Sequence, residues 1–364
     1  MRAMVINRIV SLEEDHNPLE PAELPDPAPA EKEILVKVSV CGVCHTELDE
    51  TEGRTPPPRL PVVPGHQVVG RVAGNGPGAA RFNPGDRVGV AWIHSACRSE
   101  CKFCESGNEN LCPDFVATGR DVNGGYAELM TVHEDFAYPI PEELTDAEAA
   151  PLLCAGAIGW RSLRLAGFNA GGFSGIGGPG GRVPDLTESA GVPRLGLTGF
   201  GASGHLVLKL VRGIFPETEV FVFARSVEER EFSKELGAVW AGGIGDEPPH
   251  RLDAIIDTTP AWNPLVEALR LLKPGGRLVI NAIRKEDGDK DCLLDIDYAS
   301  HLWLEKEIKS VANVARRDVS EMLGLAARIE LKPEVETFPL EEANRVLVEL
   351  KSGRIRGAKV LQIG

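Results

Sequence analysis

Between Arg194 and Ile283 the chain alternates predicted strands with predicted helices, and this alternation restricts its possible folds more than any other feature. β-rich runs appear in RLGLTGF, EVFVFAR, DAIIDTT and GRLVINAI, and helical patterns separate them in HLVLKLVRGI, VEEREFSKELG and NPLVEALRLL. Strands joined by helices cannot pair as hairpins, so they form a parallel sheet with crossover connections. We therefore predict an α/β domain built on a doubly wound parallel sheet.

The first predicted strand of this region leads into a glycine motif. Gly199-Phe200-Gly201-Ala202-Ser203-Gly204 has the form G-x-G-x-x-G and opens the first predicted helix. In this context Gly199 permits the tight turn, Gly201 lets a pyrophosphate approach the backbone, and Gly204 allows close packing of helix and strand. The motif predicts a Rossmann-type dinucleotide site, and a glycine-rich turn without a ligand is the alternative.

The end of the second strand indicates which dinucleotide binds. Sites for NAD usually place an acidic residue there, which holds the ribose 2′-hydroxyl. This strand instead ends in Ala224-Arg225-Ser226, and Arg230 follows about one helical turn later. Because Arg225, Ser226 and Arg230 can all donate hydrogen bonds to a 2′-phosphate, we predict NADP(H) in preference to NAD(H). The alternative is that Arg225 is a solvated surface residue and that NAD is accepted.

The remaining sequence suggests a second, β-rich domain. Residues 1–150 contain short β-branched runs closed by Gly or Pro, and from about Thr145 the pattern becomes helical, with Pro151 expected to break or kink the helix. We predict a catalytic domain over 1–155, a cofactor domain over 156–316 and a return to the catalytic domain over 317–364. The Gly-rich and Pro-rich segment 169–193 is expected to be a flexible surface loop.

Four of the eight cysteines lie within sixteen positions. Four thiolates complete the tetrahedral shell of Zn²⁺ and leave no position for water or substrate, which is typical of a structural site. We therefore predict a structural zinc site, with four reduced free thiols as the alternative. Its ligands are Cys97, Cys101, Cys104 and Cys112.

A second set of zinc-binding residue types is dispersed along the chain. Cys44 lies at a predicted strand-to-loop turn, His66 follows another turn, and Cys154 lies in a helical segment. Two thiolates and one imidazole would leave the fourth zinc position open, as a catalytic site requires. From spacing alone, a structural His66 and a buried apolar Cys154 are equally acceptable.

Four motifs resemble the zinc-containing alcohol dehydrogenases of the medium-chain dehydrogenase/reductase superfamily. They are Cys41-Gly42-Val43-Cys44-His45-Thr46-Glu47-Leu48, Pro64-Gly65-His66, Asn123-Gly124-Gly125-Tyr126-Ala127-Glu128 and Ala150-Pro151-Leu152-Leu153-Cys154-Ala155-Gly156. The motifs follow the family's order over nearly the whole chain. The resemblance implies a β-rich GroES-like catalytic domain beside the Rossmann domain, with two zinc ions per chain.

The resemblance also implies the catalytic roles. Cys44 (rather than Cys41), His66 and Cys154 would bind a zinc ion that acts as a Lewis acid on the alcohol oxygen, while a hydride passes to the nicotinamide. The resemblance gives Thr46 the hydroxyl that takes the alcohol proton, and it gives His45 a contact with the cofactor pyrophosphate. Glu47 would be the carboxylate that orients His66, and Trp92 would form a wall of the substrate pocket.

The sequence departs from the family pattern near the metal. Gln67 follows His66 where the family usually has Glu, and Asp49 occupies the place where many relatives have a relay histidine. Cys97 and Cys101 are separated by three residues instead of two. The proton relay is therefore expected to end at Asp49 or in water, and the structural-zinc loop is expected to bulge.

Charge and hydropathy restrict the partners. A net charge of −15 argues against nucleic acid, and no uninterrupted apolar stretch is long enough to span a membrane. We expect a cytoplasmic enzyme for a small primary alcohol or aldehyde. Family likeness suggests a homodimer or homotetramer, with residues 307–315 as an edge strand that pairs across subunits. The alternatives are an NADPH-dependent reductase of bulky or aromatic aldehydes and a catalytically inactive zinc-binding scaffold.

Overall fold

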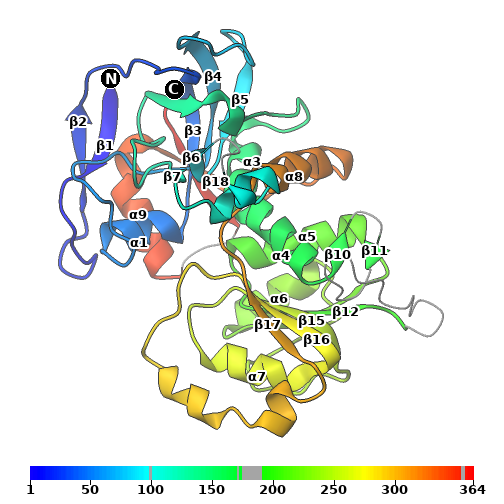
Figure 1. Cartoon of the computed structure of the whole chain (residues 1–364). Helices are drawn as coiled ribbons and strands as arrows, with labels where there is room; N and C mark the ends of the chain where they lie inside the picture. The colour runs from blue at the N-terminus through cyan, green and yellow to red at the C-terminus, as the bar shows by residue number, and fades with distance from the viewer. Residues whose placement is uncertain (98–100, 170–171, 174–190, 354–356) are drawn as a thin grey trace. The chain divides into compact units, whose positions relative to one another are not determined.

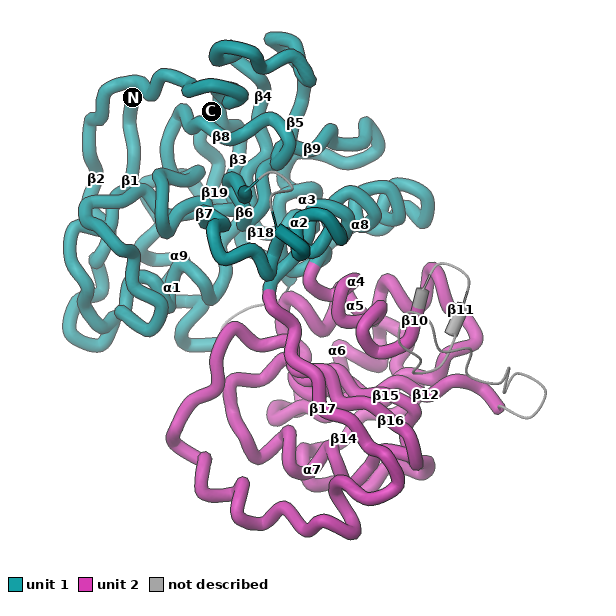
Figure 2. Tube along the Cα trace, viewed as in Figure 1, with its two compact units in different colours: residues 1–157, 313–364 teal, residues 158–312 magenta. Residues whose placement is uncertain are grey.

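The computed structural model describes residues 1–97, 101–169, 172–173, 191–353 and 357–364 (Figure 1). They form two compact units (Figure 2). Unit 1 comprises residues 1–157 and 313–364, and unit 2 comprises residues 158–312. The chain therefore leaves unit 1 once and returns to it. Among the described residues, no helix combines the length and the apolar character needed to cross a bilayer.

Unit 2 is built on a six-stranded parallel sheet, which confirms the predicted doubly wound α/β fold. Its spatial order is β14-β13-β12-β15-β16-β17, so the direction of winding reverses between β12 and β15. In such sheets ligands bind at the carboxyl ends of the strands beside this reversal. The strands are β12 (Arg194–Thr198), β13 (Glu219–Phe223), β14 (Trp240–Gly242), β15 (Leu252–Asp257), β16 (Leu272–Ile280) and β17 (Glu307–Ser310).

Helices connect these strands as the sequence pattern predicts. They are α5 (Ala202–Ile214), α6 (Val227–Glu235) and α7 (Asn263–Leu271), and α4 (Ala157–Leu165) precedes them. Val220, Phe221 and Val222 are all buried, because a parallel sheet is covered on both faces. β17 lies at the edge and is exposed along its length, which confirms the edge strand expected within 307–315.

The segment expected to be a flexible loop is described only in part. Its neighbourhood contains a short antiparallel pair, β10 (Phe168–Asn169) and β11 (Gly172–Phe173). Residues 170–171 and 174–190 lie outside the described residues. Unit 2 also contains the short helical turns η5 (Lys290–Asp295) and η6 (Tyr298–Leu302).

Unit 1 is β-rich, as predicted. Its main sheet has seven strands, which pair antiparallel except for β18 and β19. These strands are β3 (Glu33–Val43), β4 (Val68–Asn75), β5 (Arg87–Val90), β8 (Leu129–His133), β9 (Ala137–Pro139), β18 (Val335–Pro339) and β19 (Ala358–Gln362). Two small sheets flank it, formed by β1 (Arg2–Ile6) with β2 (Leu19–Glu23) and by β6 (Ile93–Ser95) with β7 (Val116–Ala117).

The helices of unit 1 contain several of the predicted site residues. They are α1 (His45–Thr51), α2 (Lys102–Glu105), α3 (Asp146–Pro151), α8 (Arg316–Arg328) and α9 (Ala343–Lys351), with 3₁₀ turns at Glu109–Leu111, Glu134–Phe136 and Leu340–Glu342. α3 extends to Pro151, and the chain stays helical through a π-helical turn over Leu152–Gly156 into α4, so Pro151 marks a change in the helical ladder without ending the helix. α1 and α9 pack side by side (Figure 1).

Candidate active site

The first metal-binding motif lies where β3 passes directly into α1. The expected strand-to-loop turn is therefore wrong, because a helix begins at His45 with Cys44 as its N-cap. The Cys44 sulfur accepts from the backbone N–H of Thr46 at 3.4 Å, and Glu47 Oε2 accepts from the backbone N–H of Cys44 at 2.8 Å. This reciprocal capping box holds the Cys44 sulfur at the start of the helix.

Three residues from distant parts of the sequence meet beside α1. His66 Nε2 lies 3.7 Å from Cys44 Sγ and 3.3 Å from Cys154 Sγ. A sulfur and a nitrogen bound to one tetrahedral zinc ion are roughly 3.5 Å apart, given Zn–S and Zn–N bonds of about 2.3 and 2.0 Å. The three ligand atoms therefore have the spacing that a shared zinc ion requires, and they leave a fourth position for another ligand.

The local backbone presents Cys154 to this group. Cys154 lies in the π-helical turn after Pro151, and single π turns inside helices are frequent at functional sites. Both neighbours, Leu153 and Ala155, are buried, whereas Cys154 itself is half-buried. The turn thus directs this one sulfur toward His66 while its neighbours pack in the core.

Glu47 connects the ligands to one another. Its Oε1 lies 2.6 Å from Nδ1 of His66, while its Oε2 holds the Cys44 backbone. A carboxylate on Nδ1 leaves Nε2 as the metal-binding nitrogen and sets the ring orientation. The Trp92 ring meets the His66 ring edge-on, with centroids 5.1 Å apart, so the predicted pocket residue contacts a candidate ligand.

The charges of this group favour a bound cation. A hydrogen bond with the Cys154 thiol and burial raise the pKa of the Cys44 thiol well above its usual value. Burial opposes ionisation of Glu47, but the neighbouring His66 and the Cys44 backbone outweigh it and lower the Glu47 pKa. A zinc ion would stabilise both thiolates in this buried setting, so the residues present fit the metal that the family implies.

The four clustered cysteines also come together. The ligand atoms of Cys97, Cys101, Cys104 and Cys112 all lie within 4.8 Å of one another. Cys101 is the N-cap of α2, and the backbone N–H of Cys104 is the main cause that lowers the Cys101 pKa to about 7. Four such sulfurs fit one closed zinc shell, and the bulge expected between Cys97 and Cys101 falls on residues 98–100, which lie outside the described residues.

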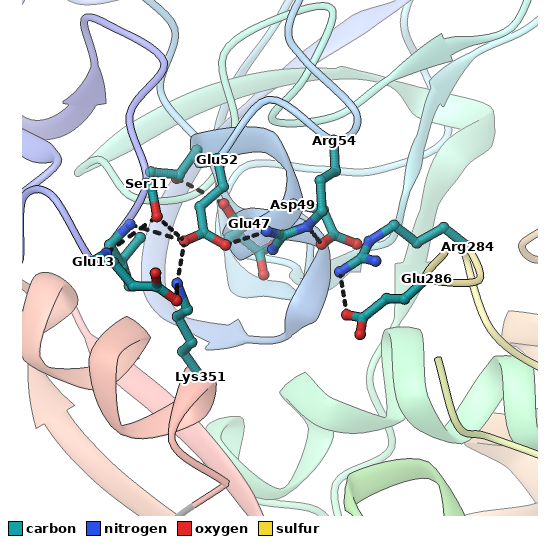
Figure 3. Close-up of polar contacts among 11 residues, drawn as sticks. Ser11, Glu13, Glu47, Asp49, Glu52, Arg54, Arg284, Glu286 and Lys351 are labelled. Atoms are coloured by element: carbon teal, nitrogen blue, oxygen red, sulfur yellow. Dashed lines mark hydrogen bonds and ion pairs between the residues drawn. The ribbon is translucent and has the colours of Figure 1, made fainter. Parts of the chain in front are cut away.

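The remaining predicted catalytic residues lie along α1. Thr46 and Asp49 are both buried and are three residues apart, which places them on one side of the helix, whereas His45 is exposed. Asp49 Oδ1 accepts from Arg54 Nε at 2.5 Å (Figure 3). The candidate end of the proton relay is therefore a carboxylate paired with an arginine.

Arg54 is itself held by Glu52, a buried carboxylate at the end of α1 (Figure 3). Glu52 Oε1 accepts from the Leu12 backbone N–H and from Lys351 of α9, each at 2.8 Å, and from Ser11 Oγ at 3.3 Å. Burial opposes ionisation of Glu52, but the hydrogen bonds from Lys351, Leu12 and Arg54 outweigh it and lower its pKa to about 2.

This pKa predicts that the wild type and a Glu52→Gln variant differ in stability by an amount that depends on pH. Because the folded pKa of about 2 lies below the ordinary 4.5, the Glu52 carboxylate stabilises the fold above pH 4.5, and this contribution disappears as the pH falls toward 2. Glu52→Gln should lower the free energy of unfolding at pH 7 by about 2 kcal/mol, a figure discounted for screening. Urea titrations of both proteins from pH 7 to pH 2.5 should show the difference shrinking.

Glu13 provides the matched control for this prediction. It pairs with the same Lys351 at 3.3 Å but is 82% exposed, so Glu13→Gln should change the stability by less than about 0.5 kcal/mol. A constant difference between wild type and Glu52→Gln across this pH range would show that the Glu52 charge does not stabilise the fold.

Sequence reasoning missed both Arg54 and Glu50. Neither carboxylate oxygen of the fully buried Glu50 has a hydrogen-bond partner among the described residues, and burial raises its pKa well above the usual value. The sequence signal that could have identified Glu50 is its spacing of three residues from Glu47, because this spacing places the two acids on one side of α1.

In unit 2 the glycine motif forms the predicted turn between β12 and α5. Gly199 has a φ of +80°, and a Cβ on Gly204 would lie 2.9 Å from the Gly199 carbonyl oxygen. A Cβ on Gly201, the N-cap of α5, would meet no described atom within 4 Å, so the backbone N–H groups there are approachable. The turn therefore fits the pyrophosphate that the family implies.

The predicted 2′-phosphate residues gather after β13. Arg225 is exposed, and Ser226 is the N-cap of α6, where its hydroxyl accepts from the Glu229 backbone N–H at 3.1 Å. Arg230 Nε donates to the Ser226 carbonyl oxygen at 3.1 Å. Two arginines, one immediately before the N-cap and one in the first turn, thus lie at one helix start, where the helix dipole also favours an anion.

The sequence matches known proteins over nearly its whole length. The model of the alcohol dehydrogenase GroES-like domain matches residues 30–142. The probable alcohol dehydrogenase AdhA of Mycobacterium tuberculosis is 40% identical over 354 residues, which cover 96% of this chain and 94% of that protein. An alcohol dehydrogenase of Geobacillus stearothermophilus is 32% identical over 372 residues, covering 100% of this chain and 99% of that protein.

A solved structure agrees with these relatives. A cinnamyl alcohol dehydrogenase of Sorghum bicolor superposes with a TM-score of 0.79 at 26% identity, covering 99% of this chain and 97% of that one. The chain belongs to the zinc-containing alcohol dehydrogenases of the medium-chain dehydrogenase/reductase superfamily. It is therefore an oxidoreductase of the alcohol dehydrogenase family, whose members use NAD(P).

Proposed function

We propose that this protein is a zinc-dependent alcohol dehydrogenase that transfers a hydride reversibly between a small primary alcohol or aldehyde and NADP(H). The observation that carries this proposal is the group formed by Cys44, His66 and Cys154. Its ligand atoms lie within 4.8 Å of one another and leave a fourth zinc position open.

The residues around this group have distinct tasks. When bound, zinc supplies a Lewis acid that acidifies the alcohol hydroxyl. Thr46 takes the released proton, and the relay ends at Asp49, three residues further along α1, or in water. Glu47 holds both His66 and the Cys44 backbone in place. Trp92, packed edge-on against His66, limits the width of the substrate site.

The dinucleotide preference follows from the residues after β13. Gly199, Gly201 and Gly204 accept the pyrophosphate, and the family resemblance assigns His45 to the same group. Arg225, Ser226 and Arg230 bind the 2′-phosphate, because two arginines stand at a helix start where NAD-dependent enzymes usually place an acid.

A substrate panel tests the proposal. The protein should turn over simple primary alcohols with NADP and the matching aldehydes with NADPH. Atomic emission on the same preparation should show two zinc ions per chain. Chelation should remove the activity, and added zinc should restore it. Protein that binds two zinc ions but turns over none of these pairs would instead be the inactive scaffold.

A second candidate function is NADPH-dependent reduction of bulky or aromatic aldehydes. The Sorghum bicolor relative named as a cinnamyl alcohol dehydrogenase favours it. The same residues serve both directions, so the discriminating quantity is kcat/KM for an aromatic aldehyde with NADPH against that for a short primary alcohol with NADP.

We also propose that the protein forms a homodimer or homotetramer through β17. This edge strand is exposed, and three large apolar side chains in the segment that leads to it, Leu294, Tyr298 and Trp303, are exposed as well, with exposed fractions of 87%, 63% and 54%. An unprotected edge with apolar neighbours favours strand pairing between copies. Ile308→Lys, at an exposed position of β17, should lower the mass measured by sedimentation equilibrium, whereas Lys309→Arg should leave it unchanged.

A further inference from the structure

A buried ion pair lies at the carboxyl end of the central strands of unit 2. Asp257, the last residue of β15, is fully buried, and the Lys285 side chain, which pairs with its Oδ2, is only 8% exposed. The Lys285 ammonium also donates to the carbonyl oxygens of Thr259 at 2.9 Å and Ala261 at 2.7 Å. An ammonium group has three N–H donors, so each has an acceptor on residues 257–261.

The second carboxylate oxygen of Asp257 extends this network to β12. Oδ1 accepts from Thr198 Oγ1 at 2.6 Å, and from Thr259 through its hydroxyl at 2.7 Å and its backbone N–H at 3.1 Å. Thr258 donates to the Thr198 carbonyl oxygen through its backbone N–H at 2.9 Å and its hydroxyl at 3.0 Å. The segment after β15 is thus attached to the last residue of β12.

That last residue immediately precedes the dinucleotide turn. A Cβ placed on Gly199 would lie 2.7 Å from Thr258 Oγ1, so Thr258 forms a wall against which the turn is seated. The opposite neighbour is β13, because the Gly199 backbone N–H donates to the Phe223 carbonyl oxygen at 2.9 Å. Lys285, 86 positions later in the chain, therefore supports this wall through Asp257 and Thr259.

The chemistry of the pair indicates what it contributes. Buried ion pairs usually add little net stability compared with apolar residues of similar volume, although losing one partner is costly. An unpaired Asp257 carboxylate next to the turn would also repel an anionic pyrophosphate. We propose that Lys285 is a positioning residue for the dinucleotide: it neutralises Asp257 and holds Thr258 against Gly199. This inference rests on the proposed function, because it presumes that the turn binds NADP(H).

Direct binding measurements test the proposal without turnover. Lys285→Met should raise the NADPH dissociation constant, measured by nicotinamide fluorescence, about tenfold, since the turn loses its preformed shape. NADPH and NADH affinities should fall by the same factor, because the turn contacts the pyrophosphate that both share. Zinc content should remain at the wild-type level. Lys273→Met is the matched control, because Lys273 pairs with Asp253 at 2.7 Å near the amino ends of β15 and β16. It should leave the dissociation constant unchanged.

A second variant distinguishes a specific loss of NADPH affinity from a general loss of folding. The double variant Asp257→Asn/Lys285→Met leaves no buried charge unpaired at this position, so circular dichroism should show a folded protein. Its NADPH dissociation constant should nevertheless be several-fold higher than that of the wild type. Wild-type affinity in the folded double variant would overturn the role of Lys285, as would equal weakening by Lys273→Met. If the wild-type protein binds neither NADPH nor NADH, the proposed function itself fails, and the role of Lys285 fails with it.

Discussion

Replacing Cys154 by alanine is expected to abolish alcohol oxidation and to lower the bound zinc from two ions per chain to one. The remaining Cys44 and His66 would supply two ligands, which is fewer than zinc sites in proteins normally have. The substrate hydroxyl would then keep its ordinary acidity, so Thr46 would have no acidified proton to accept. We expect kcat/KM to fall by at least about 10³-fold, since activating the substrate oxygen lowers the barrier by several kcal/mol.

Steady-state assays and atomic emission on the same preparation check this result. Cys292→Ala is the control, because Cys292 lies in η5 of unit 2, outside both cysteine groups, and should keep full activity and both zinc ions. Two zinc ions per chain in a folded Cys154→Ala variant would remove Cys154 from the ligand set.

Replacing Arg225 by aspartate is expected to produce the second-largest effect, a reversal of the dinucleotide preference. The change removes a guanidinium that can form charge-assisted hydrogen bonds with the 2′-phosphate, and it supplies the acid that binds the ribose 2′-hydroxyl in NAD sites. Loss of one or two such bonds corresponds to about 10- to 100-fold in kcat/KM for NADP. The activity with NAD should rise or remain constant.

The ratio of kcat/KM for NADP to that for NAD measures this change. Lys234→Asp introduces the same charge change in α6, eight residues after the Ser226 N-cap, and should leave the ratio nearly unaltered. An unchanged ratio in Arg225→Asp would mean that other residues bind the 2′-phosphate. An equal fall in kcat/KM with NADP and with NAD would instead indicate damage to the glycine turn, which is the pattern expected of Lys285→Met.

Local patterns in the sequence predicted most of the features whose interacting residues are close along the chain. The G-x-G-x-x-G motif predicted the turn because a strand, a positive φ at Gly199 and a helix start follow one another within a few residues. The four-cysteine group was predictable for the same reason. The start of α1 was missed because cysteine is an unusual N-cap, although Glu47 at the third helical position was the signal of a capping box.

Contacts between distant positions could be found only in the tertiary structure. Spacing alone left the role of Cys154 undecided, because it is 88 residues from His66 and nothing local distinguishes a ligand from a buried thiol. The pair Asp257–Lys285 likewise depends on how the chain folds around β15, whereas Asp49 and Arg54 are only five residues apart and pair across the end of α1.

The sequence by itself determined the two domain types, the dinucleotide turn and the four-cysteine cluster, since these depend on periodicity and short-range spacing. The tertiary structure showed that the ligands and the carboxylate named by the family resemblance do meet at one position, and it alone decided which cation neutralises Asp257. The physical reason is that periodicity is a local property of the backbone, whereas a metal site or a buried ion pair forms only when folding brings remote side chains within about 4 Å.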